Sequence, residues 1–271
     1  MSRSSPPPGE GRSASVARRE PGGGESAPPH PARFARDPPP PGEGNGVALI
    51  VPVLDEAETI ADVVRAVPRD VVADVIVVDG GSTDETVARA RAAGARVIVE
   101  ARSGYGGACL AGVRATARPV LAFIDGDGSD DPAEIPALVA PILAGEQDFV
   151  IGSRARGARQ KGSMGAHQLL AAHLAGLCMR ALYGVRYTDM CPLRAIRRDA
   201  LEKLGMRERT YGWNLEMQMR AARAGLRILE LPVHHRVRAG GASKVAGNLR
   251  GSLKASWQIA AALVRVAKEM R

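Results

Sequence analysis

The chain has 271 residues, of which 3% are aromatic, and a formal net charge of +8. This length is sufficient for one large α/β domain, whose core must be built mostly from alanine, valine, leucine and isoleucine. Nucleic-acid binding is the usual expectation for so basic a chain, but the sequence contains neither an aromatic stacking platform nor a recognition motif that would support it.

Residues 1–46 form a proline- and glycine-rich segment. A segment of this composition cannot bury enough apolar surface to offset its chain entropy, so we predict a disordered tail with no part in an active site. It contains no apolar stretch of the kind that export signals require, and the three cysteines of the chain are scattered. These features predict a reduced, cytoplasmic protein.

Apolar runs alternate with helical segments from residue 47 onward. Buried strands are expected at residues 47–53, 74–79, 96–100 and 120–124, and helices at residues 58–66, 82–93 and 108–117. Ser82 and Glu85 have the spacing of a capping box, which would begin the second of these helices. Strands that are apolar throughout are typical of a parallel sheet covered on both faces. The alternation therefore predicts an α/β fold with a doubly wound, mostly parallel sheet flanked by helices.

Two glycines, Gly104 and Gly106, precede the helix expected at residues 108–117. They could belong to a dinucleotide-binding fingerprint, but Cys109 replaces the third glycine of that motif. The fingerprint also belongs after the first strand of the sheet, whereas these glycines follow the third. A nicotinamide or flavin enzyme is therefore not expected. Two roles remain open for the glycines, which are cradling of a phosphate and close backbone packing.

The strand at residues 120–124 ends in the acidic stretch D-G-D-G-S-D-D, which begins at Asp125. Acids at the carboxyl end of a buried strand lie where open α/β sheets bind ligands. Asp125 and Asp127 are two positions apart, so their side chains point the same way and would repel each other without a cation. A divalent ion completed by substrate phosphates would remove that repulsion.

The acidic stretch has two other possible interpretations, a turn and a calcium-binding loop. Acids and glycines after a strand are also ordinary turn chemistry, and this alternative stays open. A calcium loop is excluded, because its sixth and twelfth positions would be Asp130 and Pro136 instead of glycine and glutamate.

Beyond the acidic stretch, a helix is expected at residues 132–144, a strand at residues 148–153 and a basic, glycine-rich loop at residues 155–165. A mostly apolar helix is also expected at residues 167–183, and we expect it to pack on the core and not on a membrane. At residues 253–271 the apolar run is far shorter than the roughly 20 residues that a membrane span requires. A basic helix there could instead lie on an anionic membrane surface.

Charge is distributed unevenly along the chain. Residues 47–150 contain 8 basic and 17 acidic side chains, whereas residues 151–271 contain 23 and 7, so these parts carry charges of −9 and +16. This polarity indicates an acidic part that holds a cation and a basic part that meets phosphate or an anionic surface. A solvated arginine-rich surface is the alternative for most individual arginines.

Five motifs resemble, in the same order, those of family 2 glycosyltransferases with the GT-A fold. The resemblance is strongest to the branch that includes dolichyl-phosphate mannose synthase and bacterial polyprenyl-phosphate glycosyltransferases, and it covers about Val47 to Trp257. The motifs are V-P-V-L-D-E at residues 51–56, V-V-D-G-G-S-T-D at 77–84, D-G-D at 125–127, G-W-N-L-E-M-Q at 212–218 and R-A-G-G-A-S-K at 238–244. Each is modest alone, but their common order makes the resemblance specific.

The resemblance implies which residues bind the substrate and the metal. Asp125 and Asp127 would form the metal-binding DxD element, with Asp127 as the direct ligand. Asp79 would contact the nucleotide base, although a helix-capping acid is the alternative. The implied substrate-binding residues are Pro52, Asp55, Glu56, Asp79, Arg102, Asp125 and Ser243.

The same resemblance implies a catalytic group made of Asp127, Glu216, Arg238 and Lys244. Arg238 and Lys244 would meet phosphate near the acceptor, although solvated positions are the alternative for both. Glu216 lies on an expected helix, where a structural carboxylate is the alternative. A phosphate acceptor would need little help from a general base, whereas a hydroxyl acceptor would need Glu216 or Asp130 in that role.

The implied activity is inverting transfer of a sugar from a UDP- or GDP-sugar to a polyprenyl or dolichyl phosphate, with Mg²⁺ or Mn²⁺ as cofactor. Expected partners are thus the nucleotide-diphospho-sugar, a lipid-phosphate acceptor and the inner face of the plasma membrane, with no nucleic acid. Several relatives carry transmembrane helices after the catalytic domain and this chain does not, so a cytosolic enzyme with a small phosphorylated or hydroxylated acceptor is the alternative. A catalytically silent nucleotide-binding or membrane-associated module is a third hypothesis.

Overall fold

The computed structural model describes residues 46–101, 104–160, 163, 176–177, 179–238 and 264–265. All but the last residue of the expected tail, and most of the expected basic helix at residues 253–271, lie outside these residues. The division into a tail at residues 1–46 and a glycosyltransferase domain at residues 47–271 therefore stays a prediction.

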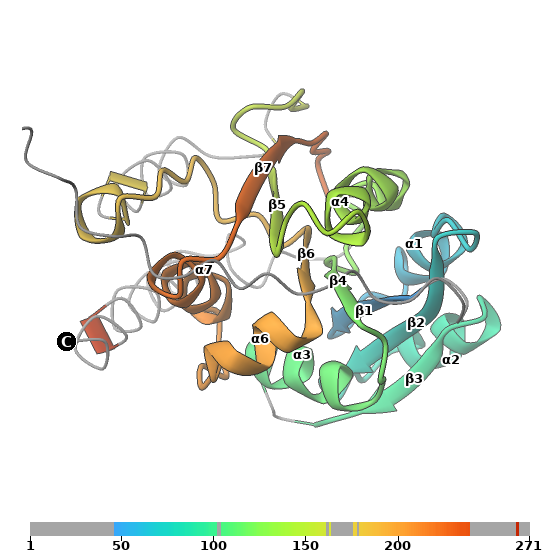
Figure 1. Cartoon of the computed structure of the whole chain (residues 1–271). Coiled ribbons are helices and arrows are strands. Elements are labelled where there is room, and N and C mark those ends of the chain that lie inside the picture. The colour runs from blue at the N-terminus through green and yellow to red at the C-terminus, as the bar shows by residue number, and fades with distance from the viewer. Residues whose placement is uncertain are drawn as a thin grey trace, which may run out of the picture. The chain divides into compact units, whose positions relative to one another are not determined.

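A seven-stranded sheet forms the centre of the described chain, in the order β3-β2-β1-β4-β6-β5-β7 (Figure 1). Only β6 is antiparallel to its neighbours, and the other paired strands run parallel. The mostly parallel α/β sheet that the alternation predicts is thus confirmed. The strands are β1 (Val47–Val53), β2 (Val72–Asp79), β3 (Arg96–Val99), β4 (Val120–Phe123), β5 (Phe149–Ser153), β6 (Arg194–Arg197) and β7 (Ile228–Pro232).

Helices cover the sheet, and Figure 1 shows them on both of its sides. Helix α3 packs on β1 and β2 and also contacts α7, whereas α1 and α2 contact each other. Over the residues that are described, no helix has both the length and the apolar character needed to cross a membrane. The helices are α1 (Ile60–Arg65), α2 (Thr86–Ala92), α3 (Gly104–Arg114), the 3₁₀ helix η1 (Pro132–Glu134), α4 (Ile135–Leu143), α6 (Arg198–Leu204) and α7 (Trp213–Arg223).

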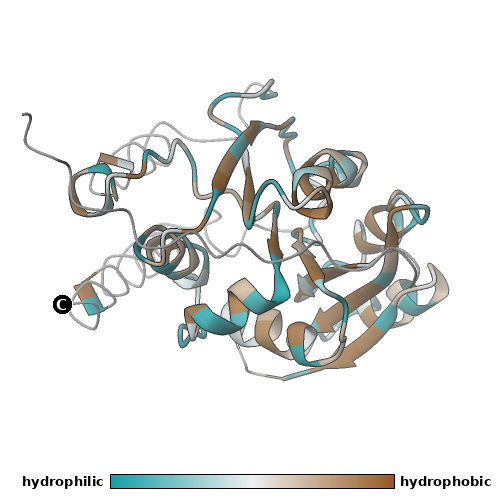
Figure 2. Cartoon of the chain, in the orientation of Figure 1, coloured by the Kyte–Doolittle hydropathy of each residue, from teal (hydrophilic) through white to brown (hydrophobic). Residues whose placement is uncertain are grey.

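The core lies between the sheet and these helices. Every residue of β1 and β4 is buried, and Figure 2 shows the central strands mostly in the hydrophobic colour. Helix α3 approaches β1 closely at Gly112, where an added Cβ would lie 2.5 Å from Cγ2 of Ile50. A core with so few aromatic residues is thus closed by small side chains that let helix and sheet come together.

The turn after β2 differs from the prediction. Helix α2 begins at Thr86, and its first turn has no side-chain cap from Ser82. The Ser82 hydroxyl instead donates to the buried carboxylate of Asp79 and accepts the Asp55 N–H at 2.8 Å. The predicted capping box is therefore wrong, because a buried carboxylate competes for the hydroxyl. Asp84 takes over at the helix start and accepts the Thr86 N–H at 3.0 Å.

Strands β6 and β7 and helix α6 have no counterpart among the predicted elements. Strand β6 reads R-A-I-R, yet Arg194 is fully buried. Its guanidinium donates to the carbonyl oxygens of Cys191 and Asn214, at 3.0 Å and 3.1 Å, and so behaves as part of the core. A strand that begins with a buried arginine carries no apolar run for a sequence pattern to detect.

The order of the strands fixes where a ligand can bind. β1 pairs with β2 on one side and with β4 on the other, and all three strands are parallel. Successive strands are therefore added on one side of β1 up to β3 and on its other side from β4, so the strand order reverses between β1 and β4. In open α/β sheets the crevice outside the carboxyl ends of the strands at such a point is the ligand site. The loops after β1, β2 and β4 carry most of the residues predicted to bind substrate.

Candidate active site at the carboxyl edge of the sheet

The loops after β1 and β2 hold each other through predicted site residues. Asp55 has a φ of 48°, in the left-handed region, and its carboxylate accepts the Thr83 N–H at 2.7 Å. Asp79 is buried and accepts the N–H groups of Gly81 and Ser82 at 3.0 Å and 3.1 Å. Pro52, also predicted, is buried within β1 opposite Val78. The carboxylates thus shape two neighbouring loops, and their contact with a nucleotide stays a prediction.

Asp125 follows β4 in the chain, two residues after the strand ends at Phe123, as the sequence predicts. The Tyr105 hydroxyl donates to its Oδ1 at 3.0 Å. Desolvation of the carboxyl group, reinforced by the charges of Asp127 and Asp130, raises the pKa of Asp125 to about 8. The raised pKa reports the cost of holding several carboxylates together without a cation.

Asp127 is held by two neighbours. The Ser129 N–H and hydroxyl donate to its Oδ1 at 2.9 Å and 2.6 Å, and the Arg238 Nε donates to its Oδ2 at 3.0 Å. Desolvation opposes ionisation, but the Ser129 hydrogen bonds and the Arg238 charge outweigh it and hold the pKa of Asp127 below its ordinary value. Arg238 also donates from Nη2 to Glu56 Oε1 at 2.9 Å. Three predicted site residues, Glu56, Asp127 and Arg238, are therefore in direct contact.

The position of Arg238 bears on its two sequence interpretations. Its side chain is 22% exposed and lies between two acids, from the loops after β1 and β4. This geometry favours a site residue over a solvated surface residue. Arg102, Ser243 and Lys244 lie outside the described residues, so their predicted roles remain predictions.

The acids at this edge fit a divalent cation that is completed by its substrate. The described residues contain no group of three or more His, Cys, Asp or Glu side chains arranged around a metal position. Mg²⁺, however, is usually bound by one or two carboxylates together with substrate phosphates and water. Asp125 and Asp127 supply two carboxylates, and the raised pKa of Asp125 indicates a place where positive charge would be favourable.

Glu216 is buried on α7 and fully engaged within the protein. Its carboxylate accepts the backbone N–H groups of Arg207 and Glu208 at 3.1 Å and 2.7 Å, and the Nε of Arg220 at 2.8 Å. This geometry favours the structural carboxylate over the general base, the two alternatives that the sequence left open.

The glycines at the start of α3 serve close packing. An added Cβ at Gly104 would lie 2.5 Å from the Arg209 carbonyl oxygen, and one at Gly106 would lie 2.5 Å from that of Glu208. The Gly107 N–H donates to the same Arg209 oxygen at 3.1 Å. Only glycine admits the backbone of residues 208–209 at these two positions. Both glycines lie within helix α3, which begins at Gly104, four residues before the predicted start.

An antiparallel seam between residues 127–134 and residues 234–238 is absent from the sequence prediction. His235 Nδ1 lies 3.0 Å from Asp130 Oδ1, and both residues are buried. The Arg236 N–H donates to the Ser129 carbonyl oxygen at 2.9 Å, and His234 Nδ1 lies 2.6 Å from Glu134 Oε1. This seam carries Arg238 to Asp127. The basic run H-H-R-V-R was the available signal, but its acidic partners lie a hundred or more residues away.

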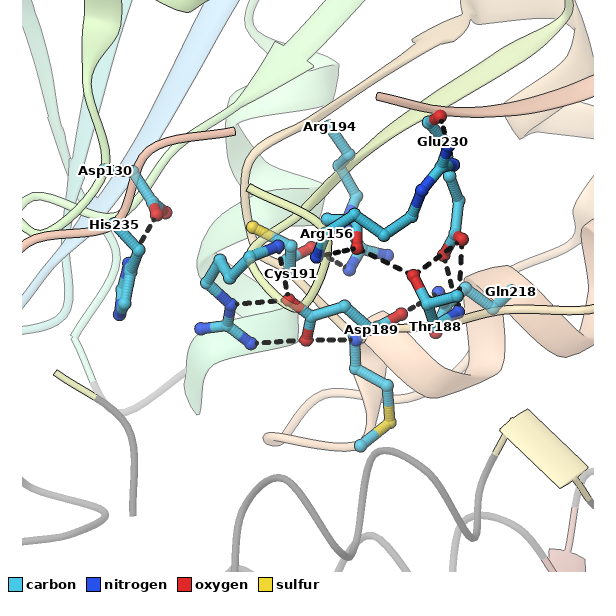
Figure 3. A network of polar contacts seen from close by, with 12 residues as sticks. Asp130, Arg156, Thr188, Asp189, Cys191, Arg194, Gln218, Glu230 and His235 are labelled. Atoms are coloured by element: carbon cyan, nitrogen blue, oxygen red, sulfur yellow. Dashed lines mark hydrogen bonds and ion pairs between the residues drawn. The ribbon is translucent and has the colours of Figure 1, made fainter. Parts of the chain in front are cut away.

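A second, partly buried polar network lies beside the seam, and Figure 3 shows it next to Asp130 and His235. Arg154 donates from Nε and Nη2 to the two oxygens of Asp189, each at 2.8 Å. Thr188 donates its N–H and hydroxyl to Glu230, both at 2.9 Å. The positive charge of Arg154 also acts on Asp125 and Asp130. The sequence prediction missed these residues, because charges that pair across the fold look like solvated residues in the sequence.

Comparison with known proteins gives consistent results. Residues 48–205 match the family described as Glycosyl transferase family 2. A protein from Mycobacterium tuberculosis named as an uncharacterized glycosyltransferase is 41% identical over 214 residues, which cover 78% of this chain and 94% of that protein. An undecaprenyl-phosphate mannosyltransferase from Micrococcus luteus is 33% identical over 227 residues, which cover 76% and 89%.

Among solved structures, the fold is similar to glucosyl-3-phosphoglycerate synthase from Mycobacterium tuberculosis. Its complex with Mn²⁺, uridine diphosphate and phosphoglyceric acid has a TM-score of 0.66 and 26% identity, with 82% of this chain and 78% of that chain covered. Another structure of that synthase contains Mg²⁺ and uridine diphosphate. The likeness confirms the GT-A fold that the sequence motifs implied.

Proposed function

This chain belongs to glycosyl transferase family 2, and on that premise we propose that it transfers a sugar from a nucleotide diphosphate sugar to a phosphate-bearing acceptor, with inversion at the anomeric carbon. One observation carries the proposal. Asp125 and Asp127 lie at the carboxyl end of β4, at the point where the strand order reverses, and Arg238, more than a hundred residues later in the chain, bonds to Asp127. Acids for a cation and a base for phosphate therefore meet where an α/β sheet binds ligands.

The donor would bind across the loops after β1, β2 and β4. Asp55 and Asp79 hold the first two loops in shape for the base and ribose. Asp125 and Asp127 would hold Mg²⁺ or Mn²⁺, which supplies positive charge to the diphosphate as it leaves. Arg238 would add charge-assisted hydrogen bonds to the phosphate oxygens. Stabilisation of charge that develops on the leaving group is the main way in which such a site lowers the barrier.

The proposed acceptor is a polyprenyl phosphate at the cytoplasmic face of a membrane. The relative from Micrococcus luteus, named for undecaprenyl phosphate, supports it. A phosphate is already anionic at neutral pH and needs little general-base help, which agrees with a Glu216 carboxylate that is engaged within the protein. A small phosphorylated acid is the second candidate, supported by the phosphoglyceric acid in the similar synthase structure. The two candidates share a phosphate group.

The proposal is tested by transfer assays with UDP- and GDP-sugars, Mn²⁺ or Mg²⁺, and either a polyprenyl phosphate or 3-phosphoglycerate. Asp127→Asn should keep the fold and reduce transfer by about a hundredfold or more, because the amide keeps the shape of a ligand but not its charge. EDTA should have the same effect on the wild type. Product from only one acceptor would choose between the two candidates.

Asp131→Asn is the matched control. Asp131 belongs to the same acidic stretch, caps η1 by accepting the Ala133 N–H at 3.0 Å, and asparagine can keep that bond. The change removes only the ion pair with Arg236, whose side chain is 62% exposed, and such a pair contributes little. This variant should transfer sugar at the wild-type rate. Wild-type activity of Asp127→Asn would show that Asp127 is a turn residue. Nucleotide binding without transfer to any acceptor would favour the silent module.

A further inference from the structure

Tyr105 makes a contact that the proposed mechanism does not use. In the part of the chain that the structure describes, its hydroxyl is the sole hydrogen-bond donor to the Asp125 carboxylate, at 3.0 Å. Asp127, by contrast, has Ser129 and Arg238 as donors. The orientation of the Asp125 carboxylate therefore depends on one phenol from the first turn of α3.

The position of that phenol is fixed from two directions. Gly104 and Gly106, on either side of Tyr105, lie against the backbone of residues 208–209 with no room for a Cβ. The ring of Tyr105 also stacks on Tyr211, with ring centroids 6.2 Å apart and an interplanar angle of 28°. The start of α3 and residues 208–211 therefore form one interlocked unit, which holds the phenol in place.

The interlocked unit is anchored in turn by α7. Glu216 accepts the N–H groups of Arg207, which precedes the unit, and of Glu208, which belongs to it. Contacts thus run without a gap from Glu216 through residues 207–211 to Tyr105, and from Tyr105 to Asp125. The links are hydrogen bonds, close backbone contacts and the ring contact between Tyr105 and Tyr211, and none of them is an ion pair between exposed side chains.

We propose that Tyr105 is the positioning residue of Asp125, and that it orients the carboxylate for a divalent cation and the donor diphosphate. The proposal rests on the proposed function, because it takes Asp125 as a cation ligand. Carboxylates that bind metals are themselves hydrogen-bonded, and loss of such an outer partner typically weakens metal binding by about 10–100-fold. A carboxylate whose single donor is removed can rotate away from the direction that the cation requires.

The test compares Tyr105→Phe with Tyr187→Phe. Tyr187 is a matched control, because it is buried and its hydroxyl donates one hydrogen bond at 3.0 Å, to the carbonyl oxygen of Gln218. Each change removes one hydrogen bond donated by a tyrosine hydroxyl, partly buried for Tyr105 and buried for Tyr187, but only the first touches Asp125. The readout is the affinity for Mn²⁺ in the presence of UDP, measured by electron paramagnetic resonance with no sugar and no turnover. The melting temperature is measured in parallel.

Tyr105→Phe should weaken Mn²⁺ binding by roughly tenfold, within the range seen for outer partners of metal ligands. Tyr187→Phe should bind Mn²⁺ like the wild type, and the two variants should show similar small changes in melting temperature. If Asp125→Asn loses Mn²⁺ while Tyr105→Phe binds it normally, the positioning role is wrong and the proposed function survives. If the wild type itself does not bind Mn²⁺ with UDP, both proposals are overturned.

Discussion

Glu216 can be tested directly, because the sequence left open whether it is a general base or a structural carboxylate and the geometry favours the second role. Glu216→Gln removes the charge at almost constant shape. A general base would lose activity with little loss of stability, whereas a structural carboxylate would lose stability. The three protein donors to this carboxylate lead us to expect the second result.

The magnitude follows from those donors. Hydrogen bonds to a charged group contribute about 1.5–3 kcal/mol each, and breaking a buried ion pair costs about 3–5 kcal/mol. The Glu216 and Arg220 side chains are only 2% and 14% exposed, so solvent screens their attraction little. Glutamine can still accept from one donor, and the contributions are not additive. We therefore expect a loss of about 3 kcal/mol, which lowers the melting temperature by roughly 6–12 °C for a domain of this size.

The assay is thermal and urea unfolding beside steady-state kinetics. Glu202→Gln is the control, because Glu202 is also a helical glutamate, 3.6 Å from Arg198, but its side chain is 62% exposed. That change should alter stability by less than about 0.5 kcal/mol. An unchanged melting temperature for Glu216→Gln, with kcat reduced about a hundredfold or more and the acid limb of its pH profile lost, would refute the structural role and identify a base.

Two further predictions concern charged residues. Arg238→Gln should slow transfer by roughly tenfold to a hundredfold and lower the metal-free melting temperature, because Glu56 and Asp127 lose a shared cation. Mn²⁺ with UDP should then raise the melting temperature less in the variant than in the wild type, because the diphosphate has lost the Arg238 donors, and equal shifts would contradict this. The pKa of Asp148 is lowered because hydrogen bonds and charge from Arg227, with the charge of Arg197, outweigh desolvation. Its stabilisation is therefore complete above the unfolded value near 3.9 and is lost as pH falls through the lower folded value. Asp148→Asn should flatten the acid-induced loss of stability below about pH 4 in urea titrations, and an unchanged slope would count against it.

The parallel half of the fold was predictable from the sequence for a physical reason. Strands covered on both faces must be apolar where they are covered, so β1, β4 and the Val75–Val78 part of β2 appear as uninterrupted apolar runs. Their carboxyl ends lie at one edge, which placed Asp125 at a ligand site before the fold was known, whereas the family resemblance assigned Asp55 and Asp79 to the same site. Strand β6 shows the limit of this reasoning, because the buried charge of Arg194 is compensated by carbonyl oxygens that no pattern reveals.

The contacts that orient the site were not predictable in the same way. Asp130 and His235 are 105 residues apart in the chain, and Tyr105 reaches Asp125 from a helix that was expected to begin later. Glu216 matched a family motif, yet the motif does not say whether its carboxylate faces substrate or backbone. Hydrogen-bond partners are decided by which loops pack together, and only the folded chain determines that.

The opposite charges of the two parts of the chain acquire a more specific meaning in the structure. The sequence suggested an acidic part for a cation and a basic part for phosphate, but in the seam several basic side chains pair with acidic side chains of the same chain. His234, His235 and Arg236 face Glu134, Asp130 and Asp131, none of which is a predicted cation ligand. Among the described basic residues of the seam, Arg238 alone bonds to such a ligand, Asp127. It follows from the proposed function that a cation bound to Asp127 would compete with Arg238 for that carboxylate and release the guanidinium from it. Its guanidinium would keep Glu56 and turn its remaining donors to the diphosphate, so binding of the cation and recruitment of Arg238 by the donor would be one coupled event.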